Sequence, residues 1–475
     1  MFDLIIRGGE VVTPQATGAF DVAIKGETIA AVTAPDTLGD DEAGRVIDAK
    51  NKIVMPGGID PHVHMHHPWI KPDGTTLTTA GPDQVGQAAL FGGTTTLMDF
   101  SYWRDGQTAL EGIESRDKDF VGRSYCDWAY HIMLHSEPPH TFSGQLAEAI
   151  QAGYPTLKIF TTNILPGRTG RMIDFGDIWE AFQVLAKEGG LGVIHAEDHD
   201  IVMHMYDKLI REGRVGFEYL AEAHNALSED LSFRRVLRLA ENVPGTALYM
   251  MHVSAGTGVQ AIADARAKGV PVYGETLHQY MLYSAEDYKR HNGQIYHTYP
   301  SLKSKEDQAR LWDGTLTGDI SCVATDELCC TLKEKTLGDR IDNTTGGNSG
   351  VEPRLGVMYT EMVNRRGYSL RKYVDMVSTN AAKIMGVYPR KGAIAAGSDA
   401  DITILDPSRR GKVTAADLHE TDYTPWEGHD IFAWPETTLL RGKIMVDGGQ
   451  LLGTPSDGQY LKRKISDDVL AGVTL

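Results

Sequence analysis

The chain has 475 residues, enough for one large domain and a smaller one, and its hydrophobic and charged fractions of 41% and 23% are ordinary for a globular enzyme. Its formal net charge of −18 argues against nucleic acid or an anionic membrane surface as a partner. The chain shows no signal-peptide pattern and no apolar run long enough to span a membrane, and its four cysteines lack disulfide or zinc-finger spacing, so we expect a cytoplasmic location.

Both ends of the chain carry short alternating segments that are typical of β-strands. Three such segments lie within the first 55 residues, and two more lie at Gly392–Pro407 and Thr437–Leu452. Strand-rich ends that flank a long middle with a different pattern favour one β-domain that is split in the sequence. We therefore expect residues 1–55 and 387–460 to form a small β-sandwich, followed by a C-terminal tail over 461–475.

The middle of the chain alternates apolar runs with helical patterns such as 177–190 and 258–269. Near-continuous apolar runs are typical of strands that are buried on both faces. The eight runs lie at 54–64, 92–100, 127–134, 156–160, 191–197, 247–254, 271–277 and 320–327. Eight strands that alternate with helices predict an α/β chain with a (β/α)₈ TIM-like barrel over residues 56–386.

Metal-binding residue types lie at the C-terminal ends of five of these runs. They are His62 and His64 in the first run, Lys158 in the fourth, His195 in the fifth, His252 in the sixth and Asp326 in the eighth. The C-terminal strand ends of such a barrel meet on one face, and residues two apart share one side of a strand. Taken singly, His195 and His252 are more typical of hydrogen-bonded core residues, the His62 and His64 pair is equally typical of core residues and of ligands, and Asp326 alone could be a helix cap. Together they predict a metal centre, because imidazole and carboxylate ligands suit zinc and similar divalent ions.

Lys158 needs a separate explanation, because a buried ammonium group is costly unless it is paired or neutralised, and it would repel a metal ion. An N-carboxylated lysine would instead offer two anionic oxygens that can bridge two ions. Two such ions generate hydroxide at neutral pH and polarise a carbonyl group.

Several stretches together resemble the amidohydrolase superfamily, and in particular its dihydropyrimidinase and hydantoinase branch. They are PGGIDPHVH, GGTTTLMDF, TLKIF, VIHAE, MMHVS, ETLHQY, ATDE, NSGVEPRLGVMY, VSTNAAKIMGVYPRKGAIAAGSDADITILDP and YTPWEGHDI, which cover nearly the whole chain. The resemblance implies a hydrolase of a cyclic amide or ureide, such as a dihydropyrimidine, a hydantoin or a related imide. It also implies assembly as a homotetramer or homodimer.

The resemblance also implies a role for each of the six residues. His62, His64 and Asp326 would bind one metal ion, His195 and His252 the second, and carboxylated Lys158 would bridge both. The ions would be zinc, with manganese or cobalt as alternatives. A bridging hydroxide would attack the amide carbonyl, and the catalytic residue Asp326 would act as general base and then as general acid.

The sequence departs from the family pattern at three places near the site. Asn163 stands where hydantoinases typically have an oxyanion-binding Tyr, Glu327 follows Asp326 in place of a His, and Gly346 stands where the family often has Asn. Loss of one oxyanion donor typically costs about 10²–10³ in rate unless another group replaces it. Candidates for that replacement are Thr161, Thr162, Asn163, Arg168 and His278.

Other residues are expected at the substrate. The predicted substrate contacts are Trp69, Thr162, Asn163, His278, Thr298 and Asn348. Trp69 would stack on a ring or pack its loop, and Asn348 would contact a ring imide or serve only in a turn. His66 and His67 follow the first strand and would either be solvated or contact the substrate. Arg168 and Arg171 would either be solvated or bind a carboxylate of the substrate. Cys329 and Cys330 are expected to line the mouth of the site.

Alternative functions stay open at this point. The same metal chemistry could act on a non-cyclic urea, carbamate or amide, or on allantoin. A non-catalytic scaffold related to dihydropyrimidinases is disfavoured because all six ligand positions are present. A single-metal deaminase is disfavoured by Lys158, which deaminases of the superfamily usually lack.

Overall fold

A computed structural model describes residues 1–70, 75–135, 138–344, 346–473 and 475. Eight parallel strands form one sheet whose neighbours follow chain order, and each of the predicted apolar runs supplies one of them. The strands are β8 (Gly58–Asp60), β11 (Thr94–Trp103), β12 (Asp127–Leu134), β13 (Thr156–Phe160), β14 (Leu191–His195), β15 (Ala247–Met250), β16 (Val272–Leu277) and β17 (Ile320–Ala324). The predicted (β/α)₈ fold class is thereby confirmed.

The sheet closes on itself just beyond the ends of its first and last strands. Val63, after β8, and Glu327, after β17, form a parallel bridge, and the His64 N–H donates to the Glu327 carbonyl at 2.7 Å. Closure brings the first and last polar strand ends of the sequence side by side. The first predicted run is shared, because Ile53–Pro56 forms strand β7 of a different sheet.

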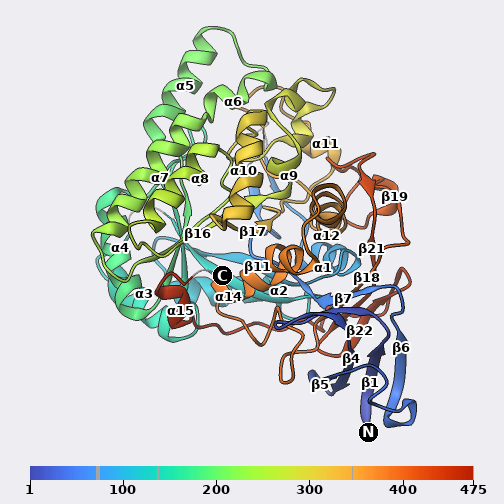
Figure 1. Ribbon diagram of the computed structural model, residues 1–475. Coiled ribbons are helices and arrows are strands. Elements are labelled where there is room, and N and C mark those ends of the chain that lie inside the picture. The colour runs from blue at the N-terminus through green and yellow to red at the C-terminus, as the bar shows by residue number, and fades with distance from the viewer. Residues whose placement is uncertain (71–74, 136–137, 345, 474) are drawn as a thin grey trace.

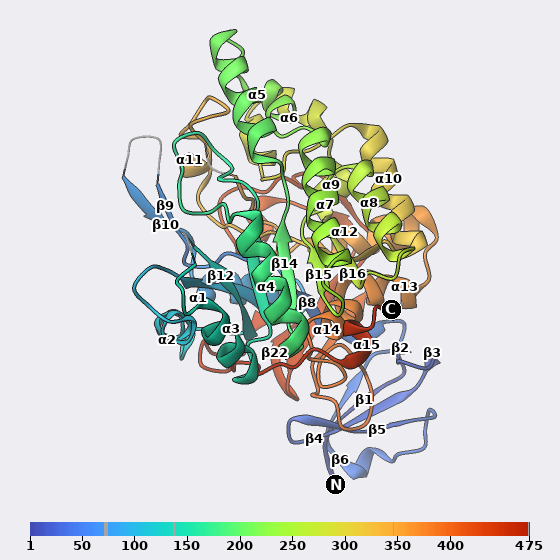
Figure 2. The same cartoon turned by 90° about the vertical axis from the view of Figure 1, so that its left-hand side faces the viewer.

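Helices cover the outside of the barrel (Figures 1 and 2). Those of ten or more residues are α1 (Pro82–Phe91), α2 (Ala109–Phe120), α3 (Phe142–Gln151), α4 (Phe175–Glu188), α5 (His199–Arg211), α7 (Ala226–Glu241), α8 (Gly256–Arg266) and α10 (Lys305–Thr317). Helix α4 shows why the sequence predicts them: its apolar residues Ile178, Phe182 and Leu185 face the sheet, and Gly189 ends it in the left-handed conformation at φ 74°.

The two chain ends form β-rich layers beside the barrel, in blue and red in Figure 1. A four-stranded sheet contains β1 (Phe2–Arg7), β4 (Asp21–Lys25), β5 (Thr28–Thr33) and β6 (Ala43–Asp48). A seven-stranded sheet combines β2 (Glu10–Val12), β3 (Thr17–Ala19) and β7 with β18 (Ile402–Asp406), β21 (Trp434–Leu440), β22 (Lys443–Asp447) and β23 (Gln450–Leu451). One hydrophobic cluster joins both sheets, so the predicted sandwich of the two chain ends is present.

Two features fix the barrel against its surroundings. Lys391 is 1% exposed, and its Nζ lies 2.6 Å from Asp127 at the start of β12 and 2.8 Å from Asp401 beside β18. The tail runs along the barrel, where the Leu461 N–H donates to the Trp128 carbonyl and the Tyr273 hydroxyl donates to the Val469 carbonyl. The tail therefore packs on its own chain, at the end of the barrel opposite the predicted site.

Candidate metal centre

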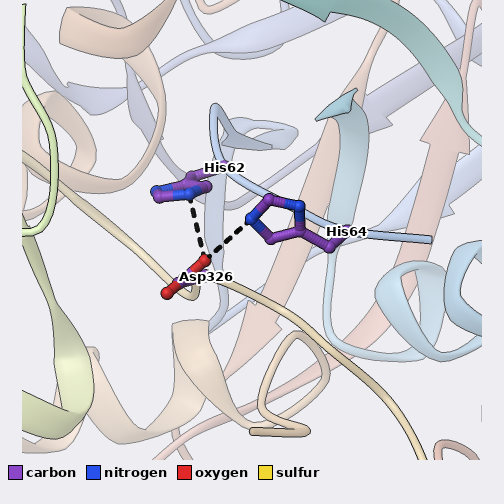
Figure 3. A group of neighbouring side chains, drawn as sticks. All are labelled: His62, His64 and Asp326. Carbon is purple, nitrogen blue, oxygen red and sulfur yellow. Dashed lines mark ion pairs between the residues drawn. The ribbon is translucent and has the colours of Figure 1, made fainter. Parts of the chain in front are cut away.

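The first strand end and the last meet at one carboxylate. His62 Nε2 lies 3.0 Å and His64 Nε2 lies 3.1 Å from the same oxygen of Asp326, and Figure 3 shows both rings directed at it. Strand alternation explains the geometry, because buried Val63 points the other way and pairs with Glu327. One ligand atom from each of the three residues lies within 4.8 Å of the others, so they can hold one ion.

The middle strands bring a second pair of imidazoles to the same place. The rings of His195 and His252 lie 4.5 Å apart between centroids, and the His252 ring lies 5.4 Å from that of His62. Lys158, 1% exposed, lies in the wall of the same cavity as these three histidines. The structure therefore brings together all six residues that the sequence proposes as ligands.

Backbone strain marks two of these positions. His252 and Asp326 have φ values of 39° and 53°, in the left-handed region that residues with a side chain rarely adopt. Each follows the end of its strand, β15 or β17, where the chain turns into a loop. Strain of this kind persists where the surrounding structure imposes it, and it concentrates at functional sites.

Two buried glutamates orient the candidate ligands. Glu275 Oε1 lies 2.8 Å from His62 Nδ1 and accepts the His252 backbone N–H at 3.0 Å. Glu197 Oε2 lies 2.9 Å from His195 Nε2, and its other oxygen lies 2.8 Å from His224 Nδ1. Carboxylates behind ligating histidines fix the tautomer and direct the second ring nitrogen at the metal.

Sequence reasoning did not single out these two glutamates. Glu197 stands two residues after His195, and Glu275 stands inside the seventh apolar run, where a buried carboxylate needs a partner. These two positions in the sequence could have identified Glu197 and Glu275 as partners of the candidate ligands.

Burial and charge set the protonation of the centre. Burial opposes the protonation of His62, but the carboxylates of Asp326 and Glu275 outweigh it and raise the pKa of His62 to about 9. Burial lowers the pKa of Lys158 to about 7 and that of His195 to about 4. A neutral imidazole and a substantially neutral amine near pH 7 are the forms that bind metal or react with carbon dioxide.

The donor set fits a pair of divalent ions. Imidazole nitrogens and a carboxylate are the ligands that zinc, manganese and cobalt accept. Among the described residues, His252 Nδ1 is buried and has no hydrogen-bond partner, and the polar contact of the Lys158 Nζ is the Met251 sulfur at 2.6 Å. Both groups thus lack the oxygen or nitrogen partner that a buried polar atom requires.

A cavity of about 250 Å³ opens above these residues. Of the predicted substrate contacts, Thr298 lies in its wall and donates its hydroxyl to Asp326 Oδ2 at 3.0 Å. Trp69 belongs to strand β9 (Pro68–Ile70), but its side chain falls outside the described part of the structure.

The remaining predicted contacts face other parts of the molecule, and none of the four belongs to the described wall of the cavity. Thr162 contacts His199 and caps the Ile164 N–H, and Asn163 accepts two backbone N–H groups of its own loop. The His278 ring stacks on Trp426 at 4.0 Å between centroids, and the Asn348 carboxamide contacts Gln279. The Asn163 side-chain oxygen is therefore engaged within its own loop, outside the described wall of the cavity.

The histidines after the first strand separate. His66 turns away, and its Nδ1 lies 2.8 Å from Asp119, outside the cavity. His67 lies in the cavity wall, where its Nδ1 contacts the Tyr102 hydroxyl. Cys329 and Cys330 are buried and free, and neither lies in the described wall.

The cavity wall also contains His135, which the sequence analysis did not single out, and two arginines for which it left substrate contact and solvation open. His135, Arg168 and Arg171 all line it, the two arginines from the loop between β13 and α4.

No helix within the described ranges is long and apolar enough to cross a membrane.

Comparisons with known proteins agree with this geometry. Residues 181–445 match the model of the Amidohydrolase family. A D-hydantoinase of Rhizobium radiobacter is 33% identical over 472 residues, covering 97% of this chain and 99% of that protein, and the dihydropyrimidinase of Rattus norvegicus is 28% identical, covering 97% and 89%. The structure of a D-hydantoinase from Bacillus sp. AR9 superposes with a TM-score of 0.92 at 31% identity, covering 98% of this chain and 100% of that one. This chain therefore belongs to the amidohydrolase family, in its hydantoinase and dihydropyrimidinase branch.

Proposed function

We propose that this chain is a hydrolase that opens a cyclic amide or ureide by attack of metal-activated water on the ring carbonyl. The observation that carries the proposal is the convergence of six ligand-type side chains from five strand ends on one cavity. Relatives of nearly the same length are named for the hydrolysis of hydantoins and dihydropyrimidines, and they support this substrate class.

Two divalent ions, most simply zinc, would be held by the six residues. His62, His64 and Asp326 would hold one ion, and His195 and His252 the other, with N-carboxylated Lys158 between them. When bound, such a pair lowers the pKa of water and polarises a carbonyl oxygen. Manganese and cobalt accept the same ligands.

Lysine carboxylation has support in the surroundings of Lys158. The other deeply buried lysines have oxygen partners: Lys391 has three carboxylates, Lys303 has the carbonyl and hydroxyl of Ser301, and Lys335 has the carbonyls of His297 and Gly347. Lys158 has no such oxygen among the described residues, and burial lowers its pKa to about 7. The neutral fraction of the amine can attack carbon dioxide, with release of one proton from nitrogen to solvent, and the carbamate so formed would supply the missing oxygens.

Asp326 would handle the proton. It lies at the cavity wall with one oxygen toward His62 and His64 and the other accepting the Thr298 hydroxyl. This fixed carboxylate can accept the proton that the attacking water loses and return it to the leaving ring nitrogen. Thr298 would keep the carboxylate in one orientation during both transfers.

The proposal is tested with chelated enzyme that is then reloaded with zinc, manganese or cobalt in the presence of bicarbonate. Substrates are dihydrouracil, hydantoin, allantoin and a linear urea. We expect ring opening only after reloading, and a decrease of about 10²–10⁴ in kcat for Asp326→Asn. Turnover of the linear urea alone would move the assignment to a non-cyclic substrate, and inactivity towards every substrate would leave a non-catalytic scaffold.

A further inference from the structure

One side of the cavity is lined by His67, His135, Arg168 and Arg171, and we call it the cationic wall because its two arginines are charged. Both arginines belong to the loop that follows β13. This strand ends at Phe160, two residues after Lys158. The wall therefore lies beside the candidate metal centre, in the same cavity.

The two arginines have no anionic partner within the described residues. No carboxylate there lies within 4.0 Å of either guanidinium, whereas buried Arg116 pairs with Asp99 and Asp119 at 2.8 Å each. Asp326, which faces the histidines, is the one carboxylate in the described cavity wall. Burial and then the neighbouring charge of Arg168 lower the pKa of Arg171 to about 9. Two adjacent guanidinium groups without a counter-ion are unfavourable, and a bound anion removes this cost.

Arg171 is held in place by the residue that departs from the family pattern. The Asn163 side-chain oxygen accepts the backbone N–H groups of Arg171 at 3.1 Å and of Met172 at 2.9 Å. The Arg171 guanidinium lies over the Phe160 ring, 5.3 Å from its centroid, and 3.5 Å from His67 Nε2. The guanidinium is thus positioned before any ligand arrives, which lowers the entropic cost of binding.

The two histidines of the wall are neutral polar groups, because burial lowers the pKa of His135 to about 3 and that of His67 well below its usual value. His135 Nε2 is buried and has no hydrogen-bond partner among the described residues. His67 uses Nδ1 on the Tyr102 hydroxyl and turns Nε2 toward Arg171. The positive charge of the two guanidinium groups therefore selects a carboxylate over an apolar substituent.

We propose that the true substrate is a cyclic amide with a carboxylate on its ring substituent, and that Arg168 and Arg171 bind this carboxylate. This inference rests on the proposed ring-opening function and specifies its substrate class. The carboxylate that ring opening itself produces is a different group, formed at the attacked carbon. Every cyclic amide gives that group on ring opening, so if the arginines bound only the newly formed carboxylate, substrates with a charged and with a neutral ring substituent would be favoured equally.

The test compares two substrates of the same shape, 5-(2-carboxyethyl)hydantoin and its carboxamide, 5-(2-carbamoylethyl)hydantoin. We expect reloaded wild-type enzyme to prefer the carboxylate by at least about 10-fold in kcat/KM. Arg171→Gln should lower kcat/KM for the carboxylate by about 10- to 100-fold, mainly through KM, and leave the carboxamide nearly unchanged.

Two further variants make the experiment decisive. Arg168→Gln removes a side chain with no hydrogen bond to other described residues, so folding is preserved even if Arg171→Gln disturbs its loop. Arg211→Gln removes one exposed cation that pairs with Asp207, and it controls for the change in net charge. We expect Arg168→Gln to reduce the preference and Arg211→Gln to retain it.

The outcomes separate the two proposals. Equal turnover of carboxylate and carboxamide by the wild type, or an unchanged preference in both cavity variants, would overturn the carboxylate inference and leave the ring-opening function intact. Failure of the reloaded wild type on every cyclic amide, neutral or charged, would overturn the proposed function and the inference with it.

Discussion

Replacement of Glu275 by Gln tests whether the buried glutamates prepare the metal centre. The Glu275 carboxylate serves three donors: His62 Nδ1 at 2.8 Å, the His252 backbone N–H at 3.0 Å and the Tyr249 hydroxyl at 2.8 Å. It is fully buried, so water cannot replace it. Gln keeps the shape but not the charge. Its one oxygen can still accept from both His62 Nδ1 and the His252 N–H, but His62 loses the negative charge that raises its basicity, and the Tyr249 hydroxyl loses its acceptor.

The expected magnitude follows from the loss of the negative charge behind His62. Replacement of a carboxylate behind a ligating histidine typically costs about 10- to 100-fold in metal affinity. At about 1.4 kcal/mol per tenfold, this corresponds to about 1.4–2.8 kcal/mol of binding free energy. The assay is titration of chelated protein with zinc against a competing chromophoric chelator, in the wild type and in Glu275→Gln.

A matched control is present elsewhere in the chain. Glu352 is also buried, and its Oε1 lies 2.9 Å from His419 Nδ1, away from the described cavity wall. Glu352→Gln should leave zinc affinity unchanged. Equal zinc affinity in the wild type and Glu275→Gln, with both proteins folded, would refute the orienting role of Glu275.

Three further predictions concern activation and stability. Recovery of activity after reloading should require bicarbonate and should speed up as pH rises through about 7, because only the neutral Lys158 amine reacts with carbon dioxide; recovery at the same rate in carbon dioxide-free buffer would contradict carboxylation. Burial raises the pKa of Glu229 to about 7, so the folded state binds the Glu229 proton more tightly than the unfolded state does. The bound proton therefore adds to the free energy of unfolding; this addition is complete below the usual pKa of 4.5 and is lost as pH rises to about 7. Between those values the wild type should lose about 3 kcal/mol of unfolding free energy that Glu229→Gln retains, as urea titrations at several pH values would show. Lys391→Met leaves Asp127, Asp399 and Asp401 without their shared buried cation and should cost about 3–5 kcal/mol in the same urea assay, whereas exposed Lys443→Met should cost at most about 1 kcal/mol.

The barrel could be predicted because its signals are local. Strands that are buried on both faces are apolar along their length, so β12 and β13 match the predicted runs to the residue. The ligand-type residues could be predicted for a related reason: barrel topology alone brings the C-terminal strand ends together. The first run was divided, because Ile53–Pro56 is as apolar as a barrel strand although it pairs in the outer sheet.

Side-chain direction within loops could not be predicted in the same way. Asn163 stands where the family pattern places an oxyanion donor, yet its carboxamide serves the backbone of Arg171 and Met172. His278 follows β16 directly, but it stacks on Trp426, which is distant in the sequence. Contacts of this kind depend on which distant segments meet, and a residue's position after a strand does not determine them.

The supporting residues depend on such distant contacts too. Glu275 reaches His62 across 213 residues of sequence, and Arg171 reaches His67 across 104. The two residues of each pair lie in different segments of the sequence, so no motif spacing predicts their contact. The cationic wall therefore became recognisable only once the loop after β13 and the loop after β8 were placed on the same cavity.

The most direct test of the central claim is the metal content of the purified chain, measured by elemental analysis after reloading with zinc and bicarbonate and removal of excess metal. The account predicts about two ions per chain in the wild type, as expected for a binuclear hydrolase, and a loss of bound metal in a His195→Ala, His252→Ala double variant. A wild-type chain that retains no metal after reloading, or a double variant that retains as much metal as the wild type, would contradict the assignment of these strand ends as a binuclear centre.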